Sequence, residues 1–133
     1  MTRRIAAFVA LALLVGAGLG VHRFLAGSVV ADVAGDALYA CAAYSGLVLL
    51  APRARRGAPA AIALTWCVAV EMLQLSGLPA QWATEVPVVR FVLGTGFDAR
   101  DLVVYAAAVA VIWATDAAFS RLPAARRPRT MEG

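Results

Sequence analysis

The stretch "WCVAVEMLQL", residues 66 to 75, places an acid and an amide inside an apolar run that is long enough to cross a bilayer. That run covers residues 58 to 78, and about 17 to 25 apolar residues are needed to span the hydrocarbon of a membrane. A carboxylate in hydrocarbon costs several kcal/mol, so it is normally kept only where it faces protein, a ligand or water. The role of this segment therefore depends on what Glu71 faces.

The rest of the chain has the composition of an integral membrane protein. Of its 133 residues, 62% are hydrophobic and 15% are charged, and the mean hydropathy is +0.80, which is far from the usual mix of a soluble domain. The apolar segments cover about residues 5–21, 33–50, 58–78 and 102–119. We predict an all-α polytopic membrane protein, a bundle of four transmembrane helices that forms one domain over residues 1–133, with no cofactor.

The arginines predict the orientation of this bundle. All twelve basic residues are arginine, which is typical of a GC-rich bacterial genome. If there are four spans, nine of the twelve fall on one side: Arg3, Arg4, Arg53, Arg55, Arg56, Arg121, Arg126, Arg127 and Arg129. The positive-inside rule then puts both termini and the tail 120–133 in the cytoplasm, here of a bacterial inner membrane. Because the arginines make no single basic face, we expect no nucleic-acid partner.

The first apolar segment has an alternative interpretation as a signal peptide. The residues "TRR" suit the positive start of such a peptide, and "GAGLG" supplies small residues that resemble a cleavage site. We favour a membrane span because the apolar run is at the long end for a signal peptide. Cleavage would leave the topology of the other three spans unchanged.

Polar residues of three spans are predicted to meet on the side opposite the nine arginines. The segments "ADVAGDALYA" and "GFDARDLVVY" open the second and fourth spans, and each places two acids and a tyrosine on one helix face. We expect Asp98 to cap the fourth helix, and Glu71 to interact, directly or through water, with Arg90, the nearest cation on that side in sequence. The candidate cluster comprises Asp36, Glu71, Gln74, Arg90, Asp98, Asp101, Tyr105 and Arg23.

The connection "PAQWATEVPVVRFVLGTGFDARD", residues 79–101, is long for a helical bundle. It is amphipathic and carries Trp82, a residue type enriched at headgroup level. We therefore predict a short interfacial or re-entrant segment between the third and fourth spans.

These motifs resemble two families of membrane proteins. Glu71, Gln74, Arg90, Asp98 and Asp101 occur in the order seen in VanZ-like proteins, where an E-x-x-Q helix precedes an arginine and a D-x-x-D-x-x-x-N helix start. A closer resemblance is to the small four-span bacterial proteins of domain of unknown function (DUF) 2809. It rests on "HRFLAG", "GDALYA", "EMLQL" and "LGTGFDARDLVVY" and covers nearly the whole chain.

The resemblance implies a fold and a topology. The closer family has no established activity, and VanZ-like proteins are associated with reduced sensitivity to glycopeptide antibiotics. This chain differs from both patterns, because Tyr105 stands where VanZ-like proteins have asparagine and Ala108 where glycine is common.

Four functions remain open from the sequence. The cluster could be a purely structural network that sets helix packing. It could bind an anionic amphiphile, such as an anionic lipid or a lipid-linked cell-envelope precursor, at the outer leaflet, with Arg90 and Arg23 on the head group. It could belong to an enzyme in which Glu71 or Asp101 is a general base or the acids hold a divalent cation, although no metal-spacing motif or activated serine favours this. A proton-coupled transporter is the fourth, and the position of Glu71 away from the midplane argues against it.

Overall fold

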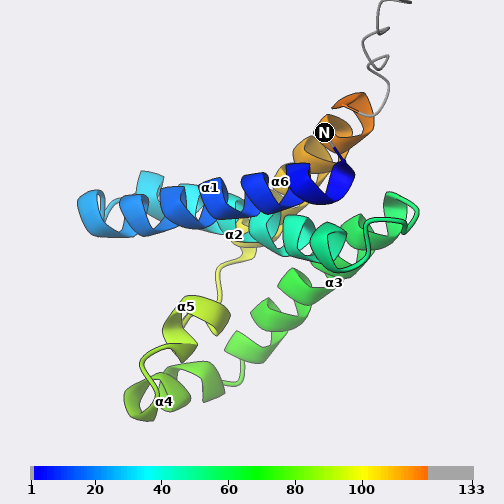
Figure 1. The fold of residues 1–133 in the computed structure, drawn as a ribbon. Coiled ribbons are helices and arrows are strands. Elements are labelled where there is room, and N and C mark those ends of the chain that lie inside the picture. Colours follow the sequence, from blue (N-terminus) through cyan, green and yellow to red (C-terminus); the bar gives the residue numbers. More distant parts are fainter. Residues whose placement is uncertain (1, 120–133) are drawn as a thin grey trace, which may run out of the picture.

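The computed structural model describes residues 2–119, so the predicted tail 120–133 lies outside the described residues. Within this range every regular element is a helix, which confirms the predicted fold class. The six helices are α1 (Arg3–Phe24), α2 (Val29–Leu50), α3 (Gly57–Gln74), α4 (Leu78–Glu85), α5 (Val89–Leu93) and α6 (Ala99–Phe119), shown in Figure 1.

Four of these helices, α1, α2, α3 and α6, are long and apolar enough to cross a membrane, as predicted. The third ends at Gln74, four residues before the predicted end of its span. The early end has a local cause, because Gly77 adopts a left-handed conformation with φ 72° and the Ser76 hydroxyl donates to the Leu73 carbonyl at 2.6 Å. Both features are typical of a helix terminus, where carbonyl groups lack partners in the helix.

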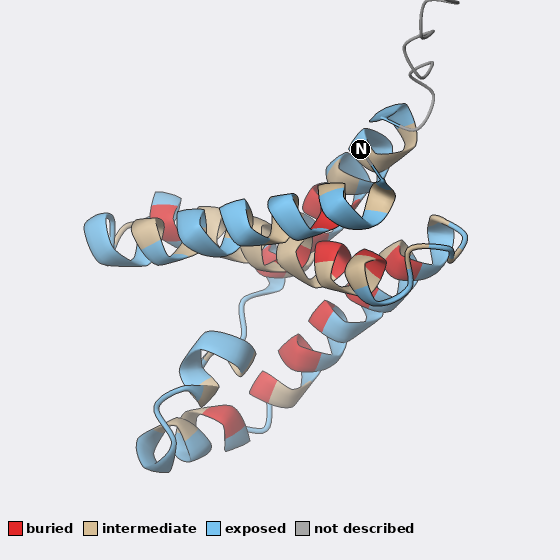
Figure 2. Cartoon of the chain, in the orientation of Figure 1, coloured by how far each residue is buried: buried red, intermediate tan, exposed pale blue. Residues whose placement is uncertain are grey.

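The surface of α1 is compatible with a multi-pass membrane protein. Leu13 is 69% exposed and Leu19 is 60% exposed, and Ala7 is the only residue of α1 that is buried. Figure 2 shows that most of this helix is exposed along its length. A helix that is apolar all round is stable where lipid covers it, because its backbone groups are satisfied internally and its side chains need no water.

The centre of the bundle is α2, which packs against α1, α3 and α6, while α3 also packs against α6. The core between them is built largely from small side chains around Tyr44 and Tyr105, namely Ala40, Ala63, Cys67 and Ala108. Small residues allow helix backbones to approach closely, which is the main source of packing energy between helices in lipid. The Cys41 thiol donates to the Ala108 carbonyl at 3.6 Å, so it joins α2 to α6.

One end of the bundle brings together the start of α1, the loop 51–56 and the end of α6, and we call it the arginine end. The Arg3 guanidinium lies 2.7 Å from Asp116 and donates to the carbonyls of Pro52 and Ala54 at 2.9 and 2.8 Å. The Tyr44 hydroxyl also donates to Asp116, at 2.7 Å. These contacts place the first and last spans and the α2–α3 loop at one end, as four antiparallel spans require.

The connection between α3 and α6 folds into the two short helices α4 and α5, which pack against each other (Figure 1). The predicted short helical segment is therefore present, in two pieces. Pro79 lies in the first turn of α4, where its missing N–H costs nothing. α4 contacts the end of α3, so the pair extends the bundle at the end opposite the arginines.

Candidate binding groove

Glu71 lies at this opposite end, which we call the acidic end and which comprises the ends of α1 and α3 and the starts of α2 and α6. The Glu71 side chain is fully buried, with 0% exposed. One carboxylate oxygen accepts a hydrogen bond from the Tyr105 hydroxyl at 3.1 Å, and the other accepts one from the backbone N–H of Asp98 at 3.3 Å. Glu71 therefore joins the end of α3 to the start of α6.

Glu71 and Arg90 form no direct ion pair among the described residues, so the direct form of the predicted interaction is wrong. Arg90 lies on α5 and is exposed, and no ion pair in the described part of the chain involves it. The reason is the path of the chain after α5, which returns the backbone of Asp98, rather than the Arg90 side chain, to Glu71. A buried carboxylate needs hydrogen-bond donors, and neutral donors supply them here.

Two more acids from other helices lie beside this contact. The Tyr105 hydroxyl is 3.4 Å from a carboxylate oxygen of Asp36, so the polar faces of α2, α3 and α6 meet. Asp36 and Asp101 line the same groove as Tyr105. Asp101 is 9% exposed, and among residues 2–119 no group donates a hydrogen bond to its Oδ1 atom.

Asp98 caps α6, as expected from the sequence. Its Oδ1 atom accepts a hydrogen bond from the backbone N–H of Arg100 at 2.8 Å, which satisfies one of the free donors at the helix start. The Arg100 guanidinium lies 3.2 Å from Asp98 and 3.7 Å from Asp101. Arg100 is therefore engaged with acids of its own helix start.

A hydrogen bond from Gln74 links the end of α3 to α5. Its Nε2 atom donates to the Leu93 carbonyl at 2.7 Å, and its Oε1 atom is buried without a hydrogen bond. The contact requires glycine at the next position, because Gly94 has φ 63° and a Cβ atom there would collide with the Gln74 amide. Gln74 thus positions the short helix that carries Arg90.

Two further contacts hold α5 in place, and the sequence did not indicate them. The Tyr39 hydroxyl donates to the Val92 carbonyl at 2.7 Å and accepts from the Trp66 indole N–H at 2.7 Å. The His22 ring of α1 meets the Phe91 ring edge to face, with centroids 5.2 Å apart. The spacing of Asp36 and Tyr39 on one helix face was the one signal that could have drawn attention to Tyr39.

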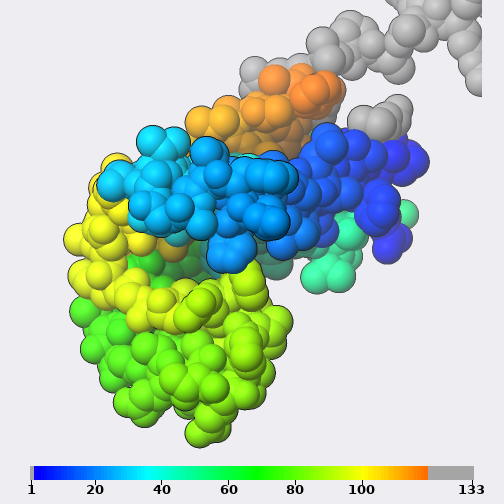
Figure 3. Space-filling model, turned by 90° about the vertical axis from the view of Figure 1, so that its left-hand side faces the viewer, coloured from blue at the N-terminus to red at the C-terminus, as the bar shows by residue number. Residues whose placement is uncertain are grey.

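A groove of about 690 Å³ is lined by residues of α1, α2 and α5 and by the start of α6. Figure 3 shows the surface hollowed between α1 and the residues around α5. Apolar residues make up much of its wall, including Leu14, Leu19, Leu38 and Val92. Ligand sites are usually clefts of about 300 to 1,000 Å³ with a few polar groups, so this groove is the candidate site.

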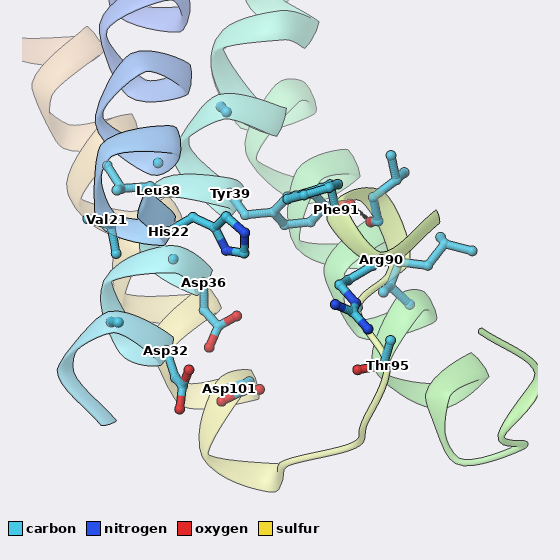
Figure 4. A pocket seen from close by; sticks show the side chains of 18 of the residues that line it. Val21, His22, Asp32, Asp36, Leu38, Tyr39, Arg90, Phe91, Thr95 and Asp101 are labelled. Atoms are coloured by element: carbon cyan, nitrogen blue, oxygen red, sulfur yellow. Dashed lines mark hydrogen bonds between the residues drawn. The ribbon is translucent and has the colours of Figure 1, made fainter. Parts of the chain in front are cut away.

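The groove carries charges of both signs, and Asp98 and Arg100 line it at the start of α6. Asp32, Asp36 and Asp101 line it from α2 and α6, and Arg90 lines it from α5 (Figure 4). The His22 ring also points into this space. Within residues 2–119 no group of three or more histidine, cysteine, aspartate or glutamate side chains is arranged to hold a metal ion.

The structure brings some of the eight sequence candidates together and separates others. Hydrogen bonds link Tyr105 to Asp36 and Glu71 and link Glu71 to the Asp98 backbone, and the groove is also lined by Asp101, Gln74 and Arg90. Arg23 does not line the groove, and its guanidinium lies 5.9 Å from the ring of its neighbour Phe24. A role of these residues in binding stays a prediction.

Comparison with known proteins gives one match. A family described as protein of unknown function, DUF2809, matches residues 25–109, from the α1–α2 connection to the buried middle of α6. No curated protein and no solved structure matches the chain significantly. The more distant resemblance to VanZ-like proteins stays a prediction. Because the match covers more than half of the sequence and includes the acidic end of the bundle, the chain belongs to the DUF2809 family.

Proposed function

We propose that this protein is a multi-pass membrane protein that binds an amphiphile through the groove at its acidic end, with an anionic part of the head group on Arg90. The observation that carries the proposal is an exposed arginine that forms no ion pair within residues 2–119 and lies at a groove with many apolar lining residues. A guanidinium presents a fork of donors that matches phosphate or carboxylate oxygens, which makes it suited to this task.

The way in which α5 is held supports the proposal. Gln74 and Tyr39 fix the carbonyls of Leu93 and Val92, and these bonds place Arg90 across the groove from the acids of α2 and α6. A ligand gains affinity when the residues that contact it are held in position before binding. The apolar residues of the groove give an acyl chain a surface to lie against.

Two residues of the cluster, Glu71 and Tyr105, have a structural role instead of a role in binding. Glu71 accepts hydrogen bonds from the Tyr105 hydroxyl and from the backbone N–H of Asp98, so both Glu71 oxygens already have partners. We assign these two residues to helix packing, because a buried network whose members are satisfied fixes the positions of the helices that carry it. The ligand would contact Arg90 and the acids that line the groove.

A binding test can use two arginines of the acidic end. We expect the full-length protein, released gently into detergent, to retain phospholipid in native mass spectrometry in preference to diacylglycerol with the same acyl chains. Arg90→Gln is expected to weaken phospholipid binding about tenfold, because it removes a charge-assisted hydrogen bond. Arg23→Gln is the matched control, since Arg23 lies outside the groove. Equal retention by the two variants, or no retained lipid in the wild type, would contradict the proposal.

We further propose that the arginine end is cytoplasmic and that the groove faces the outer leaflet of a bacterial inner membrane. The described part of the arginine end holds Arg3, Arg4, Arg53, Arg55 and Arg56, and the acidic end holds Arg23, Arg90 and Arg100. This excess supports a cytoplasmic location of the arginine end by the positive-inside rule.

Cysteine labelling tests this orientation. In a background with Cys41→Ser and Cys67→Ala, a membrane-impermeant maleimide added to intact cells is expected to label Ala26→Cys at the acidic end. It is not expected to label Ala51→Cys at the arginine end until the cells are opened. Labelling of Ala51→Cys alone in intact cells would reverse the orientation.

A further inference from the structure

We infer that the loop between α5 and α6, residues 94–97, forms a phosphate site together with Arg90. Its donors are the Arg90 guanidinium, the Thr95 hydroxyl and the backbone N–H groups of Thr95 and Gly96. This inference rests on the proposed function, because it names a phosphate as the anionic part of the ligand and adds residues that hold it in the same groove.

The first observation is a set of unused donors on one wall of the groove. Arg90, Thr95 and Gly96 all line the groove. Figure 4 shows the side chains of Arg90 and Thr95 on the same side of this space, with Asp32 and Asp36 on the other side. Among residues 2–119 the Thr95 hydroxyl and the N–H groups of Thr95 and Gly96 have no hydrogen-bond partner, and Arg90 forms no ion pair. These donors are therefore available to an anion.

The second observation is a glycine that the fold does not require. Gly94 has φ 63°, and a Cβ atom there would collide with the Gln74 amide, so conformation and packing both explain this glycine. Gly96 has no left-handed φ, and a Cβ atom there would meet no atom within 4 Å. Glycine also occurs where a ligand must come close to the backbone. The open space beside Gly96 is therefore room for the ligand.

The loop is fixed at both ends by the same helix. Gln74 of α3 donates to the Leu93 carbonyl at 2.7 Å, just before the loop. Glu71 of α3 accepts a hydrogen bond from the Asp98 N–H at 3.3 Å, just after it. A ligand that binds to donors already held in place loses less affinity to the ordering of the protein. These two contacts therefore prepare the loop for binding.

The arrangement of donors suits a phosphate better than a carboxylate. The two oxygens of a carboxylate match the fork of a single guanidinium, which leaves the donors of the loop unused. The oxygens of a phosphate are arranged as a tetrahedron, so a phosphate can contact the Arg90 guanidinium and the loop at the same time. Successive backbone N–H groups in turns form anion sites of this kind.

The acids of the groove leave this wall open to an anion. Arg100 lies 3.2 Å from Asp98 and 3.7 Å from Asp101, so it offsets part of the charge of both acids. Arg90 has no such acid partner among the described residues. The acids of α2 lie across the groove and disfavour an anion near that helix. The phosphate is therefore held at α5 and the loop.

The test compares two single-chain anions in native mass spectrometry of the full-length protein in detergent. Hexadecyl phosphate and palmitate have unbranched chains with the same number of carbon atoms and differ at the anionic group. We expect the wild type to bind hexadecyl phosphate about tenfold more tightly, the difference that one additional charge-assisted hydrogen bond makes. Equal affinities that both fall in Arg90→Gln would overturn the phosphate assignment and leave the proposed function standing.

Gly96→Ala separates binding from folding. The change adds one methyl group to the space beside the loop, keeps the charge, and meets no atom of the fold. The unfolding temperature in detergent is expected to stay the same or rise slightly, because alanine restricts the unfolded chain more than glycine does. Binding of hexadecyl phosphate is expected to weaken about tenfold. Gly57→Ala is the control, because Gly57 starts α3 outside the groove and also has open space at its Cβ position.

Thr95→Val removes the hydroxyl and keeps the shape of the side chain. We expect it to weaken binding of hexadecyl phosphate about fivefold, the effect of one hydrogen bond. Thr84→Val is the control, because Thr84 lies on α4 outside the groove and its hydroxyl donates to the Gln81 carbonyl of the same helix. If Gly96→Ala fails to fold, this pair of variants still gives the result.

The possible failures are distinguishable. If Gly96→Ala and Thr95→Val bind hexadecyl phosphate as tightly as their controls while Arg90→Gln does not, the loop is not part of the site and the proposed function stands. If no anionic amphiphile binds in an Arg90-dependent way, both the inference and the proposed function are refuted.

Discussion

Replacement of Glu71 by alanine is expected to lower the free energy of unfolding by about 3 kcal/mol, because two donors lose their acceptor on Glu71 and a buried side chain is removed. These donors are the Tyr105 hydroxyl and the Asp98 backbone N–H, and Tyr105 is buried. The measurement is unfolding of the purified protein in mixed micelles with increasing sodium dodecyl sulfate. Glu85→Ala is the control, and as an exposed change it should stay within about 0.5 kcal/mol of the wild type.

Double-mutant cycles identify the partner of Glu71. With Tyr105→Phe, the effects of the two changes should fall short of additivity by about 1 kcal/mol, since each removes the same hydrogen bond. With Arg90→Ala the effects should add within about 0.5 kcal/mol, because the two side chains do not touch. Coupling to Arg90 and additivity with Tyr105 would contradict the arrangement described for the acidic end.

Arg3→Ala is expected to lower the free energy of unfolding by about 2 kcal/mol, which is less than for a fully buried pair because a fifth of the Arg3 side chain is exposed. The change removes the bonds that join α1 to Asp116 of α6 and to the Pro52 and Ala54 carbonyls. Arg3→Lys should recover part of the loss, since a single ammonium cannot reproduce the planar fork.

The neighbouring arginine is the control for this change. Arg4 is exposed, and no hydrogen bond or ion pair of its side chain occurs among the described residues. Arg4→Ala removes one positive charge, as Arg3→Ala does. It should change the free energy of unfolding by no more than about 0.5 kcal/mol in the same unfolding experiment. Equal destabilisation by Arg3→Ala and Arg4→Ala would show that charge, and not the contacts of Arg3, stabilises this end.

The spans and the cap of α6 could be predicted because they depend on neighbours in sequence. An apolar run of sufficient length predicts a membrane helix wherever it occurs. Asp98 caps α6 through the N–H of Arg100, two residues away. The acids and tyrosines at the starts of α2 and α6 share a helix face because of the helical repeat alone.

The partners of the polar residues could not be predicted in the same way. Arg3 and Asp116 are 113 residues apart, and nothing local in either helix indicates the other. Glu71 accepts a hydrogen bond from a backbone N–H. Every residue except proline carries this group, so the residue types in the sequence do not show which residue is the donor. Arg90 is the nearest cation in sequence on that side, yet the Tyr105 hydroxyl and the Asp98 N–H, and no direct contact with Arg90, supply the hydrogen bonds of Glu71.

The sequence by itself determined four apolar helices, the gathering of most of the described arginines at the end opposite Glu71, and the short helical connection before α6. These are properties of composition and periodicity, which act over a few turns of helix. Only the tertiary structure decided that Glu71 bonds to Tyr105 and the Asp98 backbone, that Gln74 and Tyr39 fix α5, and that Arg90 lines a groove opposite Asp36 and Asp101. The physical reason is that a buried polar group is satisfied by whichever donor or acceptor the whole chain path brings within about 3 Å of it.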